Sequence, residues 1–134
     1  MTDLNDELRM LLHGPGGPLQ GYEGDIAEIQ EELIQLGVRK PFCLVRDWRI
    51  IEVDVEDDYR KSLAKDGLSP FVLYAHQVVM HSWGRREPGD WVRSTFQHST
   101  VEGRFFESVN TMYVLLGPGV MTKGSGQAVL AIGQ

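Results

Sequence analysis

Arginine and tryptophan side chains gather in the second half of the sequence, where they can bind a protein partner. This group holds two of the three tryptophans and four arginines: Trp83, Arg85, Arg86, Trp91, Arg93 and Arg104. Such a mixture is typical of protein-binding hot spots and of platforms on which nucleic-acid bases stack. Gly84 and Pro88-Gly89 break the chain around Arg85 and Arg86, which predicts an exposed tip. We therefore expect a partner-facing surface here; the alternative is that Trp91 anchors the core and the arginines offset acidic helices.

Three histidines, His76, His81 and His98, offer imidazole groups for metal binding or proton transfer. Because His76 and His81 are five residues apart, they point to opposite faces of an extended strand, so we predict no transition-metal site. His98 is followed by Glu102 and Glu107. A histidine and a carboxylate can act as acid and base in a small hydrolase or transferase, which is the alternative function.

No motif for phosphate, calcium or a cofactor accompanies these residues, and we expect no cofactor. The glycine-rich segments 117–119 and 123–126 lack the Walker spacing. The acidic run over residues 54–58 lacks the glycine and terminal glutamate of a calcium loop and predicts a helix start instead. The single Cys43 cannot form a disulfide within the chain and is most simply a small buried side chain.

Length and composition indicate one domain over residues 1–134, with 42% hydrophobic and 24% charged residues. We expect a cytoplasmic protein that does not span a membrane, because no signal-like segment and no long apolar run is present. The net charge of −6 is unevenly distributed: residues 1–66 hold 15 acids and 8 bases, and residues 67–134 hold 4 acids and 5 bases. So few cations argue against nucleic acid as a partner.

Apolar spacing predicts the elements that position these residues. Helices are expected over residues 2–12, 26–36 and 57–65. Glycines and prolines after the first helix leave open whether residues 1–20 form a mobile arm or an oligomerisation element, so a homo-oligomer is one possible state. Strand-like runs are predicted at the following places: residues 41–45 and 49–55, as a hairpin or one continuous strand, several runs from residue 71 to 116, and residues 127–132.

These elements predict an α+β fold, with an antiparallel sheet of about five to seven strands and two or three helices packed on one face. From residue 71 onward the order of strands and turns favours a meander. The apolar side of the second helix should face a row of strand residues. The helix residues are Ile26, Ile29, Leu33 and Leu36, and the strand residues are Val78, Val92, Tyr113 and Leu115.

Three segments resemble a small bacterial and prophage-borne family of unknown function. They are Tyr74 to Val79, Gly89 to Ser94 and Asn110 to Gly117, and the resemblance covers about residues 57–120. It brings no catalytic residues. It implies an accessory factor that binds and inhibits a host protein. The expected function is therefore a small protein-binding module, a phage-derived modulator or inhibitor of a host protein.

Overall fold

The computed structural model describes residues 3–99 and 104–133, which form an α+β fold of four helices and eight strands. The helices are α1 (Leu4–His13), α2 (Ile26–Gln35), α3 (Asp57–Lys65) and α4 (Gly126–Ala131). The strands are β1 (Gly17–Gln20), β2 (Phe42–Asp54), β3 (Phe71–His81), β4 (Val92–Arg93), β5 (Gln97–Ser99), β6 (Phe105–Ser108), β7 (Met112–Leu115) and β8 (Pro118–Ser125). None of these helices is long and apolar enough to cross a membrane.

Side chains that cap the first turn explain where three of the helices begin. Asp3 Oδ1 accepts from the Asp6 N–H at 2.8 Å, and Asp25 Oδ1 accepts from the Ala27 N–H at 2.7 Å. The three predicted helices are confirmed as α1, α2 and α3, although α3 begins without a side-chain cap. The strand predicted over residues 127–132 is wrong, because Ser125 Oγ accepts from the Ala128 N–H at 3.1 Å and starts α4 instead.

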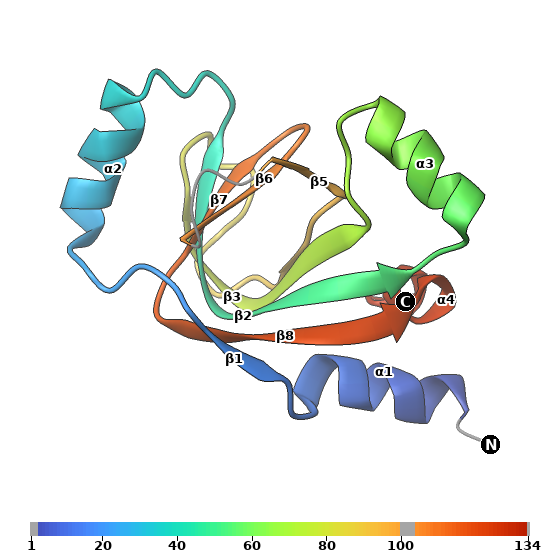
Figure 1. Cartoon of the computed structure of the whole chain (residues 1–134). Helices are drawn as coiled ribbons and strands as arrows, with labels where there is room; N and C mark the ends of the chain where they lie inside the picture. Colours follow the sequence, from blue (N-terminus) through green and yellow to red (C-terminus); the bar gives the residue numbers. More distant parts are fainter. Residues whose placement is uncertain (1–2, 100–103, 134) are drawn as a thin grey trace.

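The sheet is mixed and curls around a common centre (Figure 1). Its strand order is β1-β8-β2-β7-β6-β5, with β3 paired to the other edge of β2 and β4 paired to β3. Most ladders are antiparallel, but β7 and β8 both run parallel to β2, so the predicted meander is only partly correct. A bridge between Ser69, just before β3, and Gln97 joins β5, at one end of this order, to the segment before β3.

The long strand β2 organises this sheet. It is continuous, so the hairpin over residues 41–55 does not form. Asp47 takes a positive φ of 53°, which aspartate tolerates better than most residues. Residues before Asp47 pair with β7, and residues after it pair with β8. This single irregular residue therefore lies where β2 changes its parallel partner.

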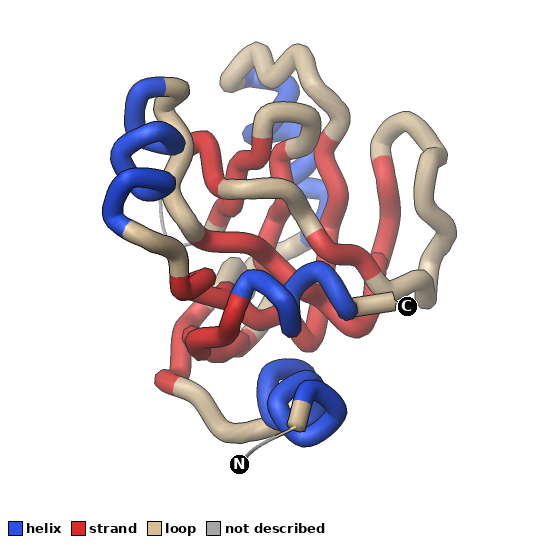
Figure 2. Tube along the Cα trace, turned by 90° about the vertical axis from the view of Figure 1, so that its right-hand side faces the viewer, coloured by secondary structure: helices blue, strands red, loops and turns tan. Residues whose placement is uncertain are grey.

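The core has an inner part enclosed by the strands and two outer parts covered by helices. The inner cluster comes only from strands: Cys43, Val45, Trp48, Leu73, Ala75, Val78, Val92, Phe106, Tyr113 and Leu115. One outer cluster lies beneath α1 and α4, which contact each other; in Figure 2, α1 lies below the strands, near the N-terminus, and α4 lies in front of them, near the C-terminus. The other outer cluster lies beneath α2. The helices thus cover the outside of the curled sheet, and its inside is filled by the strands' own side chains.

The contact predicted for α2 is correct for the helix and wrong for the strands. Ile29 and Leu33 are buried, but they pack with Leu44 and Val114 on the outside of the sheet. The predicted strand residues all belong to the inner cluster. Every residue of β7 is buried, so its sequence does not show which side faces the helix. Leu36, also predicted to pack, is 57% exposed.

The N-terminal helix α1 lies against the sheet, whereas the sequence left open a mobile arm. Leu11 is buried in the outer cluster, and the Arg49 guanidinium donates to the Leu11 carbonyl at 3.1 Å. His76 Nε2 lies 3.0 Å from the Leu12 carbonyl and donates to it. These contacts hold the C-terminal end of α1 on the sheet.

Candidate functional site

The arginine and tryptophan residues predicted as one binding surface lie in three separate places. Trp83, Arg85 and Arg86 lie in the loop between β3 and β4, where all three are exposed. Trp91 and Arg93 lie at β4 beside the end of the chain. Arg93 donates to the Val129 carbonyl of α4 at 2.9 Å, and the Trp91 ring covers Gly133. These two residues therefore support α4.

Arg104 occupies the third place, beside α2. Its guanidinium forms an ion pair of 2.8 Å with Glu32 and lies over the rings of Tyr22 and Phe105. This side chain joins α2 to β6. Of the predicted binding residues, only the group in the β3–β4 loop remains free of such structural contacts in the part of the chain that the structure describes.

The β3–β4 loop lies at the end of the sheet where β3 ends and β2 and β7 begin. Trp83 is 55% exposed, and the Arg85 guanidinium lies 4.9 Å from the centre of its ring. Arg39 and Val109 join them around an open cavity of about 500 Å³. We call Arg39, Trp83, Arg85, Arg86 and Val109 the hairpin surface. It combines exposed apolar area with cations.

A smaller cavity, the mouth pocket, opens beside this surface. Its residues are Cys43, His81, Arg85, Arg86, Val92, Thr111 and Tyr113, and its volume is about 220 Å³. Cys43 pairs with His81 on one neighbouring strand and with Tyr113 on the other. Directly paired residues point to the same side of a sheet, so the three side chains form a row across β3, β2 and β7.

Burial and the nearby arginines determine the charge of each group in the mouth pocket. Burial raises the pKa of the Cys43 thiol to about 11, against a smaller opposite effect of Arg86. Burial likewise raises the pKa of Tyr113. Burial, followed by Arg85 and Arg86, lowers the pKa of His81. All three groups are therefore neutral at neutral pH, and the arginines supply the only charge in the pocket.

The sequence drew attention to the arginines, His81 and Cys43 of this site, but not to Thr111 and Tyr113. Thr111 and Tyr113 come from β7 and its preceding turn, far from the β3–β4 loop in sequence. Only the register of β2 with β3 and β7 brings them next to His81. A non-local parallel pairing of this kind leaves no signal in a short window of sequence.

Comparison with known proteins gives one match. Residues 20–131 match the family described as Domain of unknown function (DUF6957). The chain belongs to this family. The match takes in α2 and β2 and therefore extends well beyond the resemblance over residues 57–120. No curated protein and no solved structure matches the chain.

Two groups of the alternative enzymatic site, His98 and Glu107, lie on the paired strands β5 and β6 of the DUF6957 domain. His98 is exposed on β5, beside Gly67. Glu107 forms an ion pair with Lys40 at 2.5 Å, and Glu102 lies outside the described residues. Cys43 is fully buried as expected, and its raised pKa keeps it a thiol rather than a nucleophilic thiolate.

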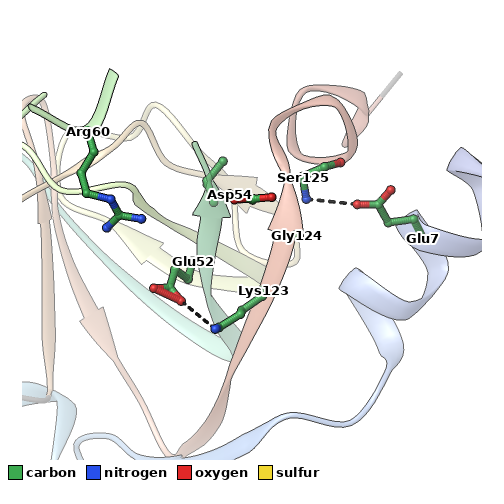
Figure 3. A pocket seen from close by; sticks show the side chains of 8 residues that line it. Glu7, Glu52, Asp54, Arg60, Lys123, Gly124 and Ser125 are labelled. Atoms are coloured by element: carbon green, nitrogen blue, oxygen red, sulfur yellow. Dashed lines mark hydrogen bonds and ion pairs between the residues drawn. The ribbon is translucent and has the colours of Figure 1, made fainter. Parts of the chain in front are cut away.

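A second cavity of about 500 Å³ lies between the start of α3 and the end of β8 (Figure 3). Part of its charge is paired within the domain. Glu52 and Lys123 form an ion pair of 3.5 Å across neighbouring strands. Figure 3 also shows the Glu7 carboxylate accepting from the Ser125 N–H at 3.0 Å. The acidic run after β2 contributes the N-cap and first turn of α3, as the sequence predicts.

In the DUF6957 domain, His76 and His81 lie in different surroundings, and two glycines of the glycine-rich segments are closely packed. His76 stacks on His13 of α1, whereas His81 lies in the mouth pocket. The described residues contain no group of three or more potential metal ligands. A Cβ at Gly119 would lie 2.3 Å from the Trp48 ring, and one at Gly124 would lie 2.7 Å from Leu11. Close packing therefore explains glycine at these two positions.

Proposed function

We propose that this domain is a small cytoplasmic protein-binding module, a phage-derived modulator of a host protein, which recognises an acidic and partly apolar segment of that protein. The observation that carries the proposal is the hairpin surface. There, Trp83 and Val109 are each 55% exposed, beside arginines that have no carboxylate partner among the described residues. Large exposed aromatic groups with neighbouring arginines are typical of binding hot spots.

Charge supports an acidic partner segment. The domain carries a net charge of −6, so its surface as a whole repels acidic proteins. The hairpin surface is a local exception, because Arg39, Arg85 and Arg86 lie together on it. Such an arrangement favours one orientation of an acidic partner and disfavours binding elsewhere.

The contact between Arg85 and Trp83 supports the same proposal. A guanidinium stacked on an indole is already oriented, so less conformational freedom is lost when a partner binds. Val109, from the turn before β7, adds apolar area across the cavity. Together they suit a segment in which acidic and apolar side chains alternate.

The test compares two double variants in binding the same partner. Proteins retained by the wild-type domain in extracts of its native host are identified, and each is purified and titrated by calorimetry. Trp83→Ala with Arg85→Gln should weaken binding by about 2 kcal/mol or more, because both residues are expected anchors. The matched control is Arg9→Gln with Met10→Ala, which removes an exposed cation and an exposed apolar side chain from α1.

The control double variant should bind like the wild type. Unaltered affinity of the hairpin double variant, with its fold intact by circular dichroism, would contradict the proposal. Equal weakening by both double variants would contradict it as well, since the effect would then not belong to the hairpin surface.

A further inference from the structure

The mouth pocket differs from the cavity of Figure 3 in the balance of its polar groups. Its lining holds two arginines, a histidine, a threonine and a tyrosine, and no carboxylate. The larger cavity of Figure 3, by contrast, is lined by three carboxylates and two cations. Donors without matching acceptors leave the mouth pocket complementary to an anion.

His81 is held in the form that donates to such an anion. Its Nδ1 accepts from the Trp83 N–H at 3.2 Å and from the Arg85 N–H at 3.4 Å. An imidazole that accepts at Nδ1 carries its proton on Nε2, so Nε2–H is left as a donor. The backbone of the β3–β4 loop thus fixes both the tautomer and the ring orientation of His81.

The remaining neutral groups of the pocket also supply donors. Tyr113 keeps its phenolic proton because burial raises its pKa, and Thr111 lies beside it with a hydroxyl group. Cys43, in the middle of the row, is an uncharged thiol that does not repel an anion. Arg85 and Arg86 extend over the row from the loop and have no ion pair with any described residue.

We infer that the mouth pocket is a binding site for a single oxyanion, with Arg85 and Arg86 as its charge partners and His81, Thr111 and Tyr113 as neutral donors. A volume of about 220 Å³ admits one carboxylate or phosphate group but not a nucleotide. This inference deepens the proposed function and rests on it in one respect: in the cell, the oxyanion is a carboxylate of the partner's acidic segment.

Inorganic phosphate is the first probe, followed by NMR of the histidine rings in the full chain. We expect saturable shifts of the His81 resonances. Bound phosphate should also raise the pKa of His81, because its charge offsets that of Arg85 and Arg86. Arg86→Gln should weaken phosphate binding at least about tenfold, because a charge-assisted contact is lost. Tyr113→Phe should weaken it by a smaller factor and leave the core filled.

Arg60→Gln is the matched control, because Arg60 is an exposed arginine of α3 that lines neither the mouth pocket nor the cavity at the hairpin surface. It should leave phosphate affinity within about twofold of wild type, since an exposed and distant charge is screened by salt. Shifts of His81 that grow linearly with phosphate would overturn the inference. Equal weakening by Arg60→Gln and Arg86→Gln would also overturn it, since the binding would then be non-specific.

A second probe separates this inference from the proposed function. It is a short blocked peptide of alternating glutamate and leucine, added with and without phosphate. Competition between peptide and phosphate supports both the oxyanion site and the proposed function. Saturable phosphate binding that the peptide does not affect supports the oxyanion site and counts against an acidic partner segment. Peptide binding that Arg86→Gln does not weaken, without saturable phosphate binding, overturns the oxyanion site and leaves the proposed function standing.

Discussion

Two tryptophans show how differently the inner core and the hairpin surface use the same side chain. Trp48 is 1% exposed, its Nε1 donates to the Leu116 carbonyl at 3.2 Å, and its ring lies against Gly119. Trp83, at the hairpin surface, is 55% exposed and contacts Arg85. Burial of an indole with its N–H satisfied is a large stabilising contribution, whereas an exposed indole contributes little to folding.

The arginines divide in the same way. Arg49 and Arg93 donate to backbone carbonyls at the ends of α1 and α4 and so hold both helices to the sheet. The side chains of Arg85 and Arg86 donate to no described group of the protein. Cations that already have partners support the fold, and those without partners are available to a ligand. The arginines that hold the helices on the sheet are therefore distinct from those of the hairpin surface.

The largest effect expected from this comparison is on stability. Trp48→Ala should lower the free energy of unfolding by about 3–5 kcal/mol, because it leaves a cavity in the inner core. Trp83→Ala should lower it by at most about 1 kcal/mol, because only an exposed cation–π contact is lost. Urea denaturation followed by circular dichroism measures both. Similar losses of unfolding free energy in the two variants would remove the distinction between the inner core and the hairpin surface.

A smaller difference is expected between two arginines. Arg93→Met should lower the free energy of unfolding by about 1–2 kcal/mol, because the hydrogen bond to the Val129 carbonyl at the C-terminal end of α4 is lost. Arg85→Met should change it by less than about 0.5 kcal/mol, because the side chain is exposed. Thermal unfolding of the two variants beside wild type checks this. A larger loss from Arg85→Met would show that the hairpin surface is structural.

Local sequence patterns predicted the three longer helices and the exposed tip of the β3–β4 loop. The helices α1, α2 and α3 follow from apolar spacing and from capping residues such as Asp3 and Asp25, which act within a few residues. The exposed tip with Arg85 and Arg86 follows from its flanking glycines and proline in the same way. In both cases the decisive interactions are local.

Other parts depend on contacts that the sequence does not record. The short α4 has too few residues for a helical pattern, and its apolar run resembles a strand although Ser125 supplies a cap. The side of β7 that faces α2 is hidden because both sides are buried. The mouth pocket needs the parallel register of β7 with β2, so Thr111 and Tyr113 were not foreseen beside His81.

The smallest predicted effect concerns pH at the packed end of the sheet, where Glu7 of α1 meets the start of α4. Hydrogen bonds from the hydroxyl and then the N–H of Ser125 lower the pKa of Glu7 from its ordinary value of 4.5. The unfolded chain therefore binds a proton more readily than the folded one. The contribution of Glu7 to stability is complete above pH 4.5 and is lost as the pH falls through the folded pKa.

The Glu7→Gln variant tests the contribution of the Glu7 carboxylate to the stability of the domain. The variant should have a lower Tm than wild type at neutral pH, and the difference should shrink as the pH falls below 4.5, because the carboxyl group of the wild type is then protonated too. Glu31→Gln, on the exposed side of α2, is the matched control and should give no such convergence. A constant difference in Tm across this range would show that Glu7 acts through packing. The charge at the junction of α1 and α4 would then not be what distinguishes the packed end from the hairpin surface.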